Sequence, residues 1–373
     1  MDECLGYLLD HVILADLSRK LGIFVGSKAS AVSDIMAATD TTLSVDDAKK
    51  QLLSACTLLT MATAVVDSHC HLSQLPVGNT LDWVEKNISG ASIVLCNEDF
   101  YQQKAGRKEV FPSLKEKAQL KFSLGIHPRF AAKLYTMNLQ AFAELVQEGR
   151  FHAIGETGLC TKWIKDRDEP VGLQHQTKLF KFHLLLAKAS GLPLVLHLRS
   201  NDNLDCIVTA SNIMKNLHLS PDHPINIHCY TGSLESAKSF LHDWPNTIFG
   251  FNPKYSEAKH LEVAAALPTS ALAVESDAPY LSDSPLATDA VIEKIARLKC
   301  EQALSLKTSI QQNIRKFLAP TQKHGDTWKK VFEMAVVCAR KETNMSVLAR
   351  HVRHYTTKTG PNLTWSKKDL EDY

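Results

Sequence analysis

The chain has 373 residues, 45% of them hydrophobic and 22% charged, a composition typical of globular proteins that excludes collagen-like and disordered chains. Its 42 basic and 40 acidic residues give a formal net charge of +2, so the overall charge does not indicate a nucleic-acid or membrane binder. No segment approaches the ~20 consecutive apolar residues that span a bilayer, and we expect no membrane partner.

The first part of the chain, residues 1–62, predicts a helical N-terminal extension. Two amphipathic stretches, GYLLDHVILADLSRKLGIF and VDDAKKQLLSACTLL, flank a polar link of small residues. No basic segment precedes a long apolar run, so no secretory signal is expected. Because the nine cysteines are scattered and form no Cys-x-x-Cys pair, we expect reduced thiols and a cytoplasmic and/or nuclear location.

Residues 63–319 alternate short apolar, β-branched runs with amphipathic stretches. Continuous apolar runs are typical of strands buried on both faces of a parallel sheet. The stretches between them predict helices, for example over Gln174 to Ser190, ending at Gly191, and over Ser233 to Leu241, beginning on a serine cap. The runs are VVDSHCHL (65–72), SIVLCN (92–97), KFSLGIH (121–127), FHAIGETGL (151–159), LPLVLHLR (192–199), INIHCY (225–230), TIFGFN (247–252) and LAVESDAP (272–279).

Eight strand–helix units over about 250 residues predict an α/β fold, a (β/α)8 TIM barrel with helical N- and C-terminal additions. A doubly wound open sheet is the structural alternative, but it does not ordinarily need eight units or polar residues at so many strand ends. Residues 320–373 predict a helical, basic C-terminal extension with a mobile tail, since lysines and arginines recur before the polar run TKTGPNLTWSKKDLEDY.

Side chains able to bind metal ions stand at the carboxyl ends of the predicted strands. His69 and His71 alternate on the first strand and therefore share a face, although two histidines in a turn would be the simpler interpretation of that pair alone. In a barrel the carboxyl ends of the strands converge on one mouth, where active sites lie. The six candidate ligands are His69, His71, Glu156, His197, His228 and Asp277.

Six ligands exceed the needs of one tetrahedral ion, so the sequence predicts two divalent cations. Glu156 is the expected bridge, because each carboxylate oxygen can bind one ion. Such a pair can polarise a scissile group and stabilise the leaving oxygen. Imidazoles suit zinc, whereas oxygen-rich sites suit magnesium or manganese, so the sequence leaves Mg, Zn and Mn open.

The motifs VDSHCHL, LGIHP, AIGETGL, LVLHLRS, IHCYTGS and VESDAPYL occur in the order and spacing of the TatD family of metal-dependent deoxyribonucleases, which includes TatD-domain proteins of animals. The resemblance covers 65–317 and neither flank. It implies hydrolysis of DNA phosphodiester bonds, on single strands or 3′ ends and with 3′–5′ exonuclease polarity, with RNA as an alternative substrate. It also implies one ion held by His69, His71, Asp277 and Glu156, and a second by Glu156, His197 and His228.

The resemblance further implies catalytic and substrate-binding roles. Glu156, Asp277 and His127 would be catalytic, with Asp277 orienting or deprotonating the attacking water and His127 contacting the substrate phosphate. Arg199 would add a contact to an anionic group, because its planar fork suits phosphate oxygens. Asn313, in QNIRKF, would contact substrate or pack its helix.

Two positions depart from the family pattern. Cys160 takes the place of an aspartate after the fourth strand, and Arg129 that of a histidine after the third. Neither is a candidate ligand, so metal binding is expected to survive these departures. Two other functions stay open: an amidohydrolase-type metal hydrolase on a small substrate, which shares the H-x-H and the final aspartate, and a catalytically weak nucleic-acid-binding barrel.

Overall fold

The computed structural model describes residues 63–74, 83–88, 91–100, 119–136, 138–163, 169–201, 204–254 and 258–319. The expected extensions over 1–62 and 320–373 lie outside these residues, so the domain limits stay predictions. None of the helices described is both long and apolar enough to cross a membrane.

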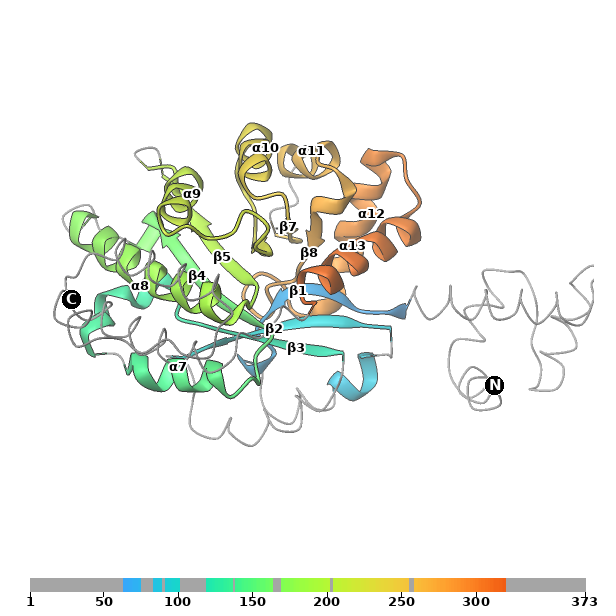
Figure 1. Ribbon diagram of the computed structural model, residues 1–373. Coiled ribbons are helices and arrows are strands. Elements are labelled where there is room, and N and C mark those ends of the chain that lie inside the picture. The colour runs from blue at the N-terminus through green and yellow to red at the C-terminus, as the bar shows by residue number, and fades with distance from the viewer. Residues whose placement is uncertain are drawn as a thin grey trace, which may run out of the picture. The chain divides into compact units, whose positions relative to one another are not determined.

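The fold is a barrel of eight parallel strands that pair in the order of the sequence, from β1 to β8 (Figure 1). This arrangement confirms the predicted (β/α)8 barrel and excludes the doubly wound alternative, in which the strand order reverses. The strands are β1 (Val66–Cys70), β2 (Ile93–Asp99), β3 (Leu120–Gly125), β4 (Ala153–Cys160), β5 (Leu194–Arg199), β6 (Ile225–Ile227), β7 (Thr247–Phe251) and β8 (Leu272–Val274).

The helices lie around the outside of the strands (Figure 1). The predicted helix ending at Ser190 is confirmed and begins five residues earlier than expected, at Glu169. The predicted serine cap is also confirmed, since Ser233 Oγ accepts a hydrogen bond from Ser236 N at 3.1 Å. The helices are α7 (Leu139–Gln147), α8 (Glu169–Ser190), α9 (Cys206–Asn216), α10 (Leu234–Asp243), α11 (Ala258–Ala266), α12 (Thr288–Lys299) and α13 (Ala303–Phe317).

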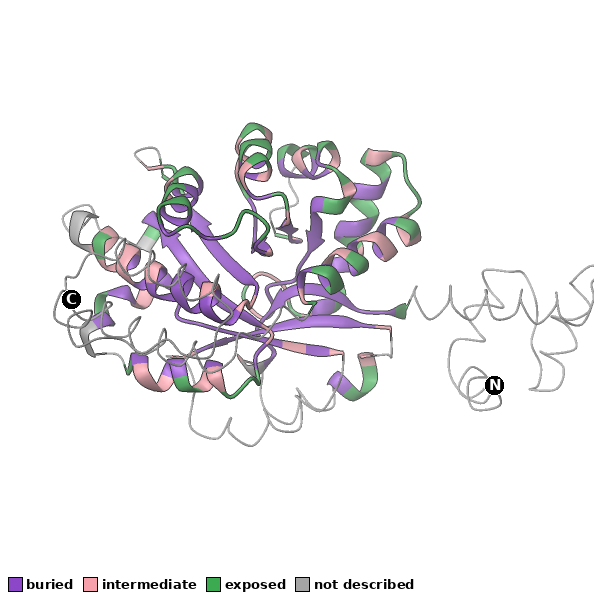
Figure 2. Cartoon of the chain, in the orientation of Figure 1, coloured by how far each residue is buried: buried purple, intermediate pink, exposed green. Residues whose placement is uncertain are grey.

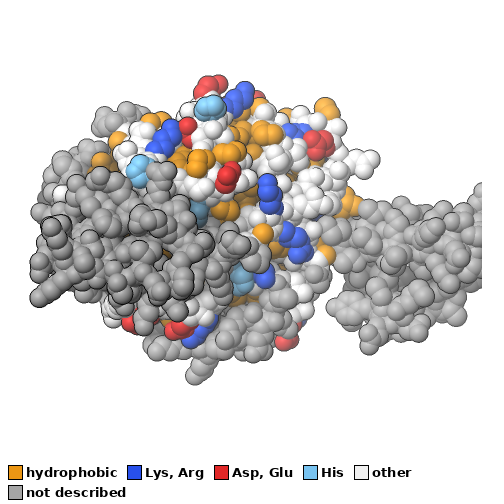
Figure 3. Space-filling model, in the orientation of Figure 1, with side chains coloured by type: hydrophobic (Ala, Val, Ile, Leu, Met, Phe, Trp, Pro, Cys, Tyr) orange, Lys and Arg blue, Asp and Glu red, His pale blue; other side chains and the backbone are white. Residues whose placement is uncertain are grey.

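The core lies in and around the strands, which Figure 2 shows as almost entirely buried, while the helices expose one face. Every strand residue is buried except Lys121, which is partly exposed. Because strands covered on both faces need apolar side chains on both, this burial explains the continuous apolar runs of the sequence. On the face drawn in Figure 3, charges of both signs are mixed over the described surface, as the small net charge predicts.

Main-chain hydrogen bonds after β8 and β1 bring the two ends of the barrel together. Asp277 N donates to His69 O at 2.9 Å, and His71 N donates to Ala278 O at 2.7 Å. Beneath them, Asp67 accepts hydrogen bonds from the hydroxyl of Ser276 at 2.5 Å and from its backbone N at 3.1 Å. This closure places the segment that carries His69 and His71 directly against the segment that carries Asp277.

Two buried histidines make the barrel sensitive to acid. His183 Nδ1 donates to Leu179 O at 2.8 Å, while its Nε2 accepts from Ile126 N at 3.2 Å, so the neutral ring is fully satisfied. Burial lowers the pKa of His183 and of His223 from 6.5 to about 4. Between pH 6.5 and pH 4 these histidines are protonated in the unfolded chain but stay neutral in the folded one. The free energy of unfolding is therefore highest above pH 6.5 and falls as the pH is lowered toward 4.

We therefore expect His183→Gln to lose less stability on acidification than the wild type does. One such histidine costs about 1.4 kcal/mol per pH unit, so the loss between pH 7 and pH 5 should shrink by about 2 kcal/mol. Urea unfolding of the protein in chelator measures this loss at each pH. His242→Gln, at an exposed position of α10, serves as the control and should keep the wild-type slope. An unchanged slope in His183→Gln would show that His183 is not buried neutral.

Candidate metal centre

The structure brings the six candidate ligands together at the mouth of the barrel. Three of them lie within strands: His69 in β1, Glu156 in β4 and His197 in β5. The other three lie just beyond the end of a strand: His71 follows β1, His228 follows β6 and Asp277 follows β8. All six are buried, none exposing more than 8% of its surface. They adjoin a cavity of about 490 Å³, which all of them except His69 line.

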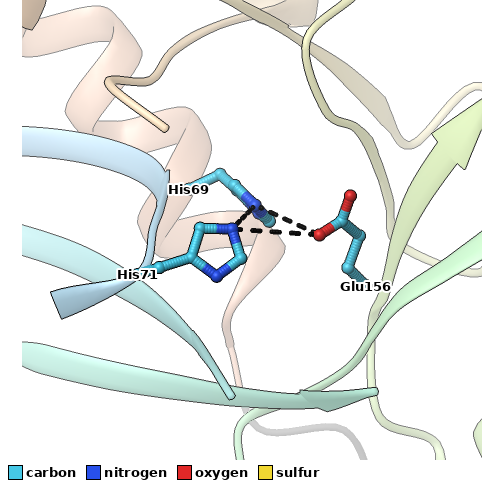
Figure 4. Close-up of side chains that lie close together, drawn as sticks. All are labelled: His69, His71 and Glu156. Carbon is cyan, nitrogen blue, oxygen red and sulfur yellow. Dashed lines mark hydrogen bonds and ion pairs between the residues drawn. The ribbon is translucent and has the colours of Figure 1, made fainter. Parts of the chain in front are cut away.

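One half of the cluster lies around Glu156 Oε2 (Figure 4). The Nε2 atoms of His69 and His71 are 3.1 Å apart and lie 3.7 and 3.9 Å from this oxygen. Asp277 Oδ1 lies 3.2 Å from His71 Nε2 and 3.7 Å from His69 Nε2. Four donor atoms therefore point at one small volume.

The other half lies around Glu156 Oε1. His197 Nδ1 is 2.5 Å and His228 Nε2 is 3.0 Å from this oxygen, and the two nitrogens are 3.3 Å apart. The two carboxylate oxygens of Glu156 thus face different sets of donors. A carboxylate placed in this way can share two cations, one on each oxygen.

The electrostatics of the cluster favour the cation-binding protonation state of Glu156, His69 and His197, whereas nearby carboxylates raise the pKa of His71 and of His228 against the effect of burial. Burial alone would raise the pKa of Glu156, but His228, His127 and His197 around it hold that pKa well below its ordinary value. Burial lowers the pKa of His69 and of His197 well below 6.5. An ionised carboxylate and neutral imidazoles are the forms that ligate divalent metals.

The donor set passes a chemical test for divalent cations. Asp277 Oδ1 is buried and has no hydrogen-bond partner among the residues described. A buried carboxylate oxygen without a partner is costly unless a cation or another group completes it. Ligand atoms within 4.8 Å of one another form three groups: His69, His71 and Glu156; His69, His228 and Asp277; and His127, Glu156 and His197.

Two glycines set the backbone on either side of Glu156. Gly155 and Gly158 have φ values of 143° and 145°, a region that side-chain-bearing residues rarely adopt. A Cβ at either position would collide with β5, at the carbonyl oxygen of Val195 or of His197. The glycines therefore let β4 lie against β5, which places Glu156 beside His197.

His127 lies next to the cluster, and its Nε2 can donate a hydrogen bond into the cavity. Its Nδ1 accepts a hydrogen bond from Arg129 N at 3.0 Å, so the proton of the neutral ring is on Nε2. That Nε2 lies 3.6 Å from Glu156 Oε1 and faces the cavity. Burial lowers the pKa of His127 to about 4, so the ring is neutral at pH 7. This tautomer favours a contact to a phosphate oxygen over metal ligation, which needs a lone pair on Nε2.

Arg199 lines the same cavity with its guanidinium buried. Nη1 donates to Leu198 O at 3.0 Å and to His228 O at 3.3 Å, which fixes the plane of the group. Arg129 and Lys162 also line the cavity, and the sequence reasoning did not single out Lys162. Its position two residues after the end of β4 is the signal that could have found it, because side chains there belong to the barrel mouth.

Asn313 lies elsewhere in the fold. Its Nδ2 donates to Thr269 O at 2.7 Å and to Leu272 O at 2.9 Å. Leu272 begins β8, whereas Asp277 follows the end of that strand. The asparagine thus attaches α13 to the end of the barrel opposite the metal centre, the helix-packing alternative considered above.

Cys160, where the family pattern has an aspartate, lines the cavity. Its backbone is fixed by Gln176, whose side chain accepts from Cys160 N at 2.8 Å and donates to Cys160 O at 3.0 Å. Sequence reasoning also missed Glu275, whose Oε1 lies 3.3 Å from His228 Nδ1. Its place in the motif VESDAPYL, two positions before Asp277, is the signal that could have found it.

Comparison with known proteins agrees with the fold. The family described as "TatD related DNase" matches residues 66–319. The chain is 30% identical over 230 residues to the human protein named "3'-5' RNA nuclease TATDN2", a match that covers 58% of this chain and 28% of that protein. It is also 30% identical over 167 residues to an uncharacterized metal-dependent hydrolase TatD of Mycobacterium tuberculosis, covering 44% of this chain and 60% of that one. The matches therefore span less than two thirds of either relative.

Solved structures share the barrel. The Escherichia coli TatD homologue YJJV aligns with a TM-score of 0.56 at 22% identity, covering 69% of this chain and 98% of that one. A TatD-family hydrolase of Entamoeba histolytica aligns with a TM-score of 0.56 at 16% identity, covering 69% and 100%. The family match extends over the whole described barrel, and several relatives bear the name of metal-dependent hydrolases. The chain therefore belongs to the TatD related DNase family.

Proposed function

We propose that the protein hydrolyses phosphodiester bonds of DNA, acting on single strands or 3′ ends with two divalent cations shared by Glu156. The observation that carries this proposal is the position of Glu156, whose two oxygens face separate sets of donors. The family's description as DNases supports a DNA substrate. The human relative's name makes RNA the competing substrate.

In this proposal His69, His71, Asp277 and Glu156 would hold one cation, while Glu156, His197 and His228 would hold the other. Bound there, the cations would neutralise charge at the scissile phosphate and at the leaving oxygen and would acidify the attacking water. Imidazoles supply four of the six ligand side chains, which suits zinc better than magnesium or manganese.

The remaining steps belong to residues of the chain itself. His127 Nε2–H and the guanidinium of Arg199 bind oxygens of the scissile phosphate and orient it. Both groups are buried, and a donor in a site of low dielectric stabilises developing charge more than a donor in water does. Asp277, at the cavity wall, accepts the proton of the attacking water.

His127→Ala is expected to lower kcat/KM about 100-fold while leaving metal binding unchanged. The substitution removes one hydrogen-bond donor from the transition state, and such donors are worth about 10²–10³ in rate. Metal titration and steady-state cleavage on the same preparation separate the two effects. Loss of one cation from this variant would contradict the assignment and make His127 a ligand.

The proposed function is tested by metal reconstitution. Protein stripped with chelator is reloaded with Mg²⁺, Mn²⁺ or Zn²⁺ and incubated with 5′-labelled single-stranded DNA, the matched RNA, and a panel of small cyclic amides and esters. The proposal expects cation-dependent shortening of the DNA from its 3′ end. Turnover of the small substrates alone would indicate an amidohydrolase-type enzyme, and salt-dependent DNA binding without cleavage would indicate a binding protein. Either outcome would overturn the proposal.

A further inference from the structure

We infer that Glu275 is a positioning residue that holds the imidazole of His228 from behind, so that His228 Nε2 points at Glu156. The inference rests on the proposed metal centre and adds a residue that touches neither substrate nor cation. It assigns Glu275 to the half of the centre formed by Glu156, His197 and His228.

The imidazole of His228 lies between two carboxylates. Its Nδ1 is 3.3 Å from Glu275 Oε1, and its Nε2 is 3.0 Å from Glu156 Oε1. Glu275 directly follows β8 and is completely buried, and its backbone N donates to Phe251 O at 3.0 Å. The side chain therefore starts from a fixed point inside the barrel.

Glu275 has no competing polar partner in the described part of the chain. Neither of its carboxylate oxygens has a properly aligned hydrogen bond there, and the same holds for His228 Nδ1. Burying a carboxylate without partners is costly, so its retention needs a physical reason. The facing nitrogen of His228 supplies that reason, because its Nδ1 lies 3.3 Å from Glu275 Oε1.

This arrangement is specific to His228 among the four histidine ligands. The nitrogens of His69, His71 and His197 that point away from Glu156 have no hydrogen-bond partner among the described residues, and no ion pair there joins them to a carboxylate. Glu275 therefore acts on one half of the centre and not on the other.

The neighbouring strand β7 leaves room for this carboxylate. At Gly250 a Cβ would collide with Glu275 Oε2, the oxygen that does not face His228. The φ angle of Gly250 is not positive, so a residue with a side chain could adopt this backbone. Glycine is needed here because a side chain would not fit beside Glu275. The absence of a side chain on β7 thus permits the position of Glu275 behind His228.

A carboxylate behind a histidine ligand keeps the proton on the far nitrogen and directs the lone pair of the near nitrogen at the cation. The carboxylate also makes the imidazole more basic and therefore a stronger metal ligand. Loss of such a partner commonly costs 10- to 100-fold in metal affinity. For this chain the loss should fall on the cation between Glu156, His197 and His228, and the cation beside His69 and His71 should keep its affinity.

The test is a metal titration of Glu275→Gln, which keeps the shape of the side chain and removes its charge. Isothermal titration with Mn²⁺ should resolve two sites in the wild type and, in the variant, one site weakened about 10- to 100-fold beside one unchanged site. Glu293→Gln, at an exposed position of α12, is the matched control and should bind as the wild type does. ¹⁵N spectra of the metal-free proteins should show a shift of the His228 Nδ1 signal between the wild type and Glu275→Gln.

Gly250→Ala provides a second route to the same change, because the added methyl group would displace the Glu275 carboxylate. It should weaken the same site in a protein that is otherwise folded. Combined with Glu275→Ala, which empties that space, Gly250→Ala should add no further loss of affinity. If Glu275→Gln does not fold, this pair and Glu275→Asp carry the test.

The outcomes separate the inference from the proposed function. Two sites of wild-type affinity in Glu275→Gln, or an equal loss at both sites, would overturn the role of Glu275 and leave the two-cation centre intact. A wild-type protein that binds no divalent cation would refute the proposed function itself.

Discussion

Glu156→Gln is expected to abolish hydrolysis with every divalent cation while leaving the barrel folded. The amide keeps the shape of the side chain but loses the negative charge that both donor sets face. Metal-ion catalysis supplies several kcal/mol of transition-state stabilisation, and each 1.4 kcal/mol is a factor of ten, so the rate should fall by about 10³-fold or more. Cleavage assays over a range of Mn²⁺ concentrations measure this loss.

Glu262→Gln, at an exposed position of α11, controls for the removal of a carboxylate as such. It should retain full activity, and both variants should unfold at urea concentrations close to the wild-type midpoint. Undiminished cleavage by Glu156→Gln would refute the two-cation mechanism, because the two carboxylate oxygens of Glu156 are the atoms that face the two sets of donors.

Asp277→Asn is expected to lower kcat by about 10²–10³-fold while leaving the barrel folded. Asparagine keeps an oxygen that can face His71, from which the aspartate oxygen lies 3.2 Å. It can no longer accept the proton of the attacking water, and loss of a general base typically costs 10²–10⁴-fold. Pre-steady-state cleavage at saturating Mn²⁺ isolates the chemical step from metal binding.

Full recovery of Asp277→Asn at saturating cation would contradict the role of Asp277 as proton acceptor and reduce it to a ligand. A matched substitution at Asp222, exposed between α9 and β6, should change neither rate nor metal dependence. The pair of variants thus distinguishes the charge at the cavity from charge on the outer surface.

Much of the fold could be predicted from sequence because a parallel barrel repeats one local rule. Each buried strand needs an apolar run, and each helix needs an amphipathic one, so the pattern of FHAIGETGL and LPLVLHLR is sufficient to locate β4 and β5. The convergence of the ligands was also predictable, since parallel strands of one barrel end at the same mouth.

The details of the site could not be predicted because they depend on backbone turns and on contacts between distant residues. Strands β6 and β8 have only three residues each, so His228 and Asp277 lie beyond them, and the positive φ of Asp277 aims its side chain in a way that strand alternation does not describe. The tautomer of His127 follows from a backbone contact to Arg129.

Glu275 and Asn313 show the same limit. Glu275 lies in the motif VESDAPYL, but the motif does not reveal its contact with His228, which exists only because β6 and β8 both flank β7. Asn313 belongs to a family motif, yet its hydrogen bonds go to the start of β8. A shared motif indicates a shared position in the fold, whereas the side chain's partners decide its role.

The central claim is that Glu156 is shared by two cations, and anomalous diffraction from crystals soaked in Mn²⁺ tests it most directly. The account predicts two anomalous peaks about 3.5–4 Å apart, one beside each carboxylate oxygen of Glu156. A single peak that leaves one of those oxygens without a cation, or no peak at saturating Mn²⁺, would contradict it.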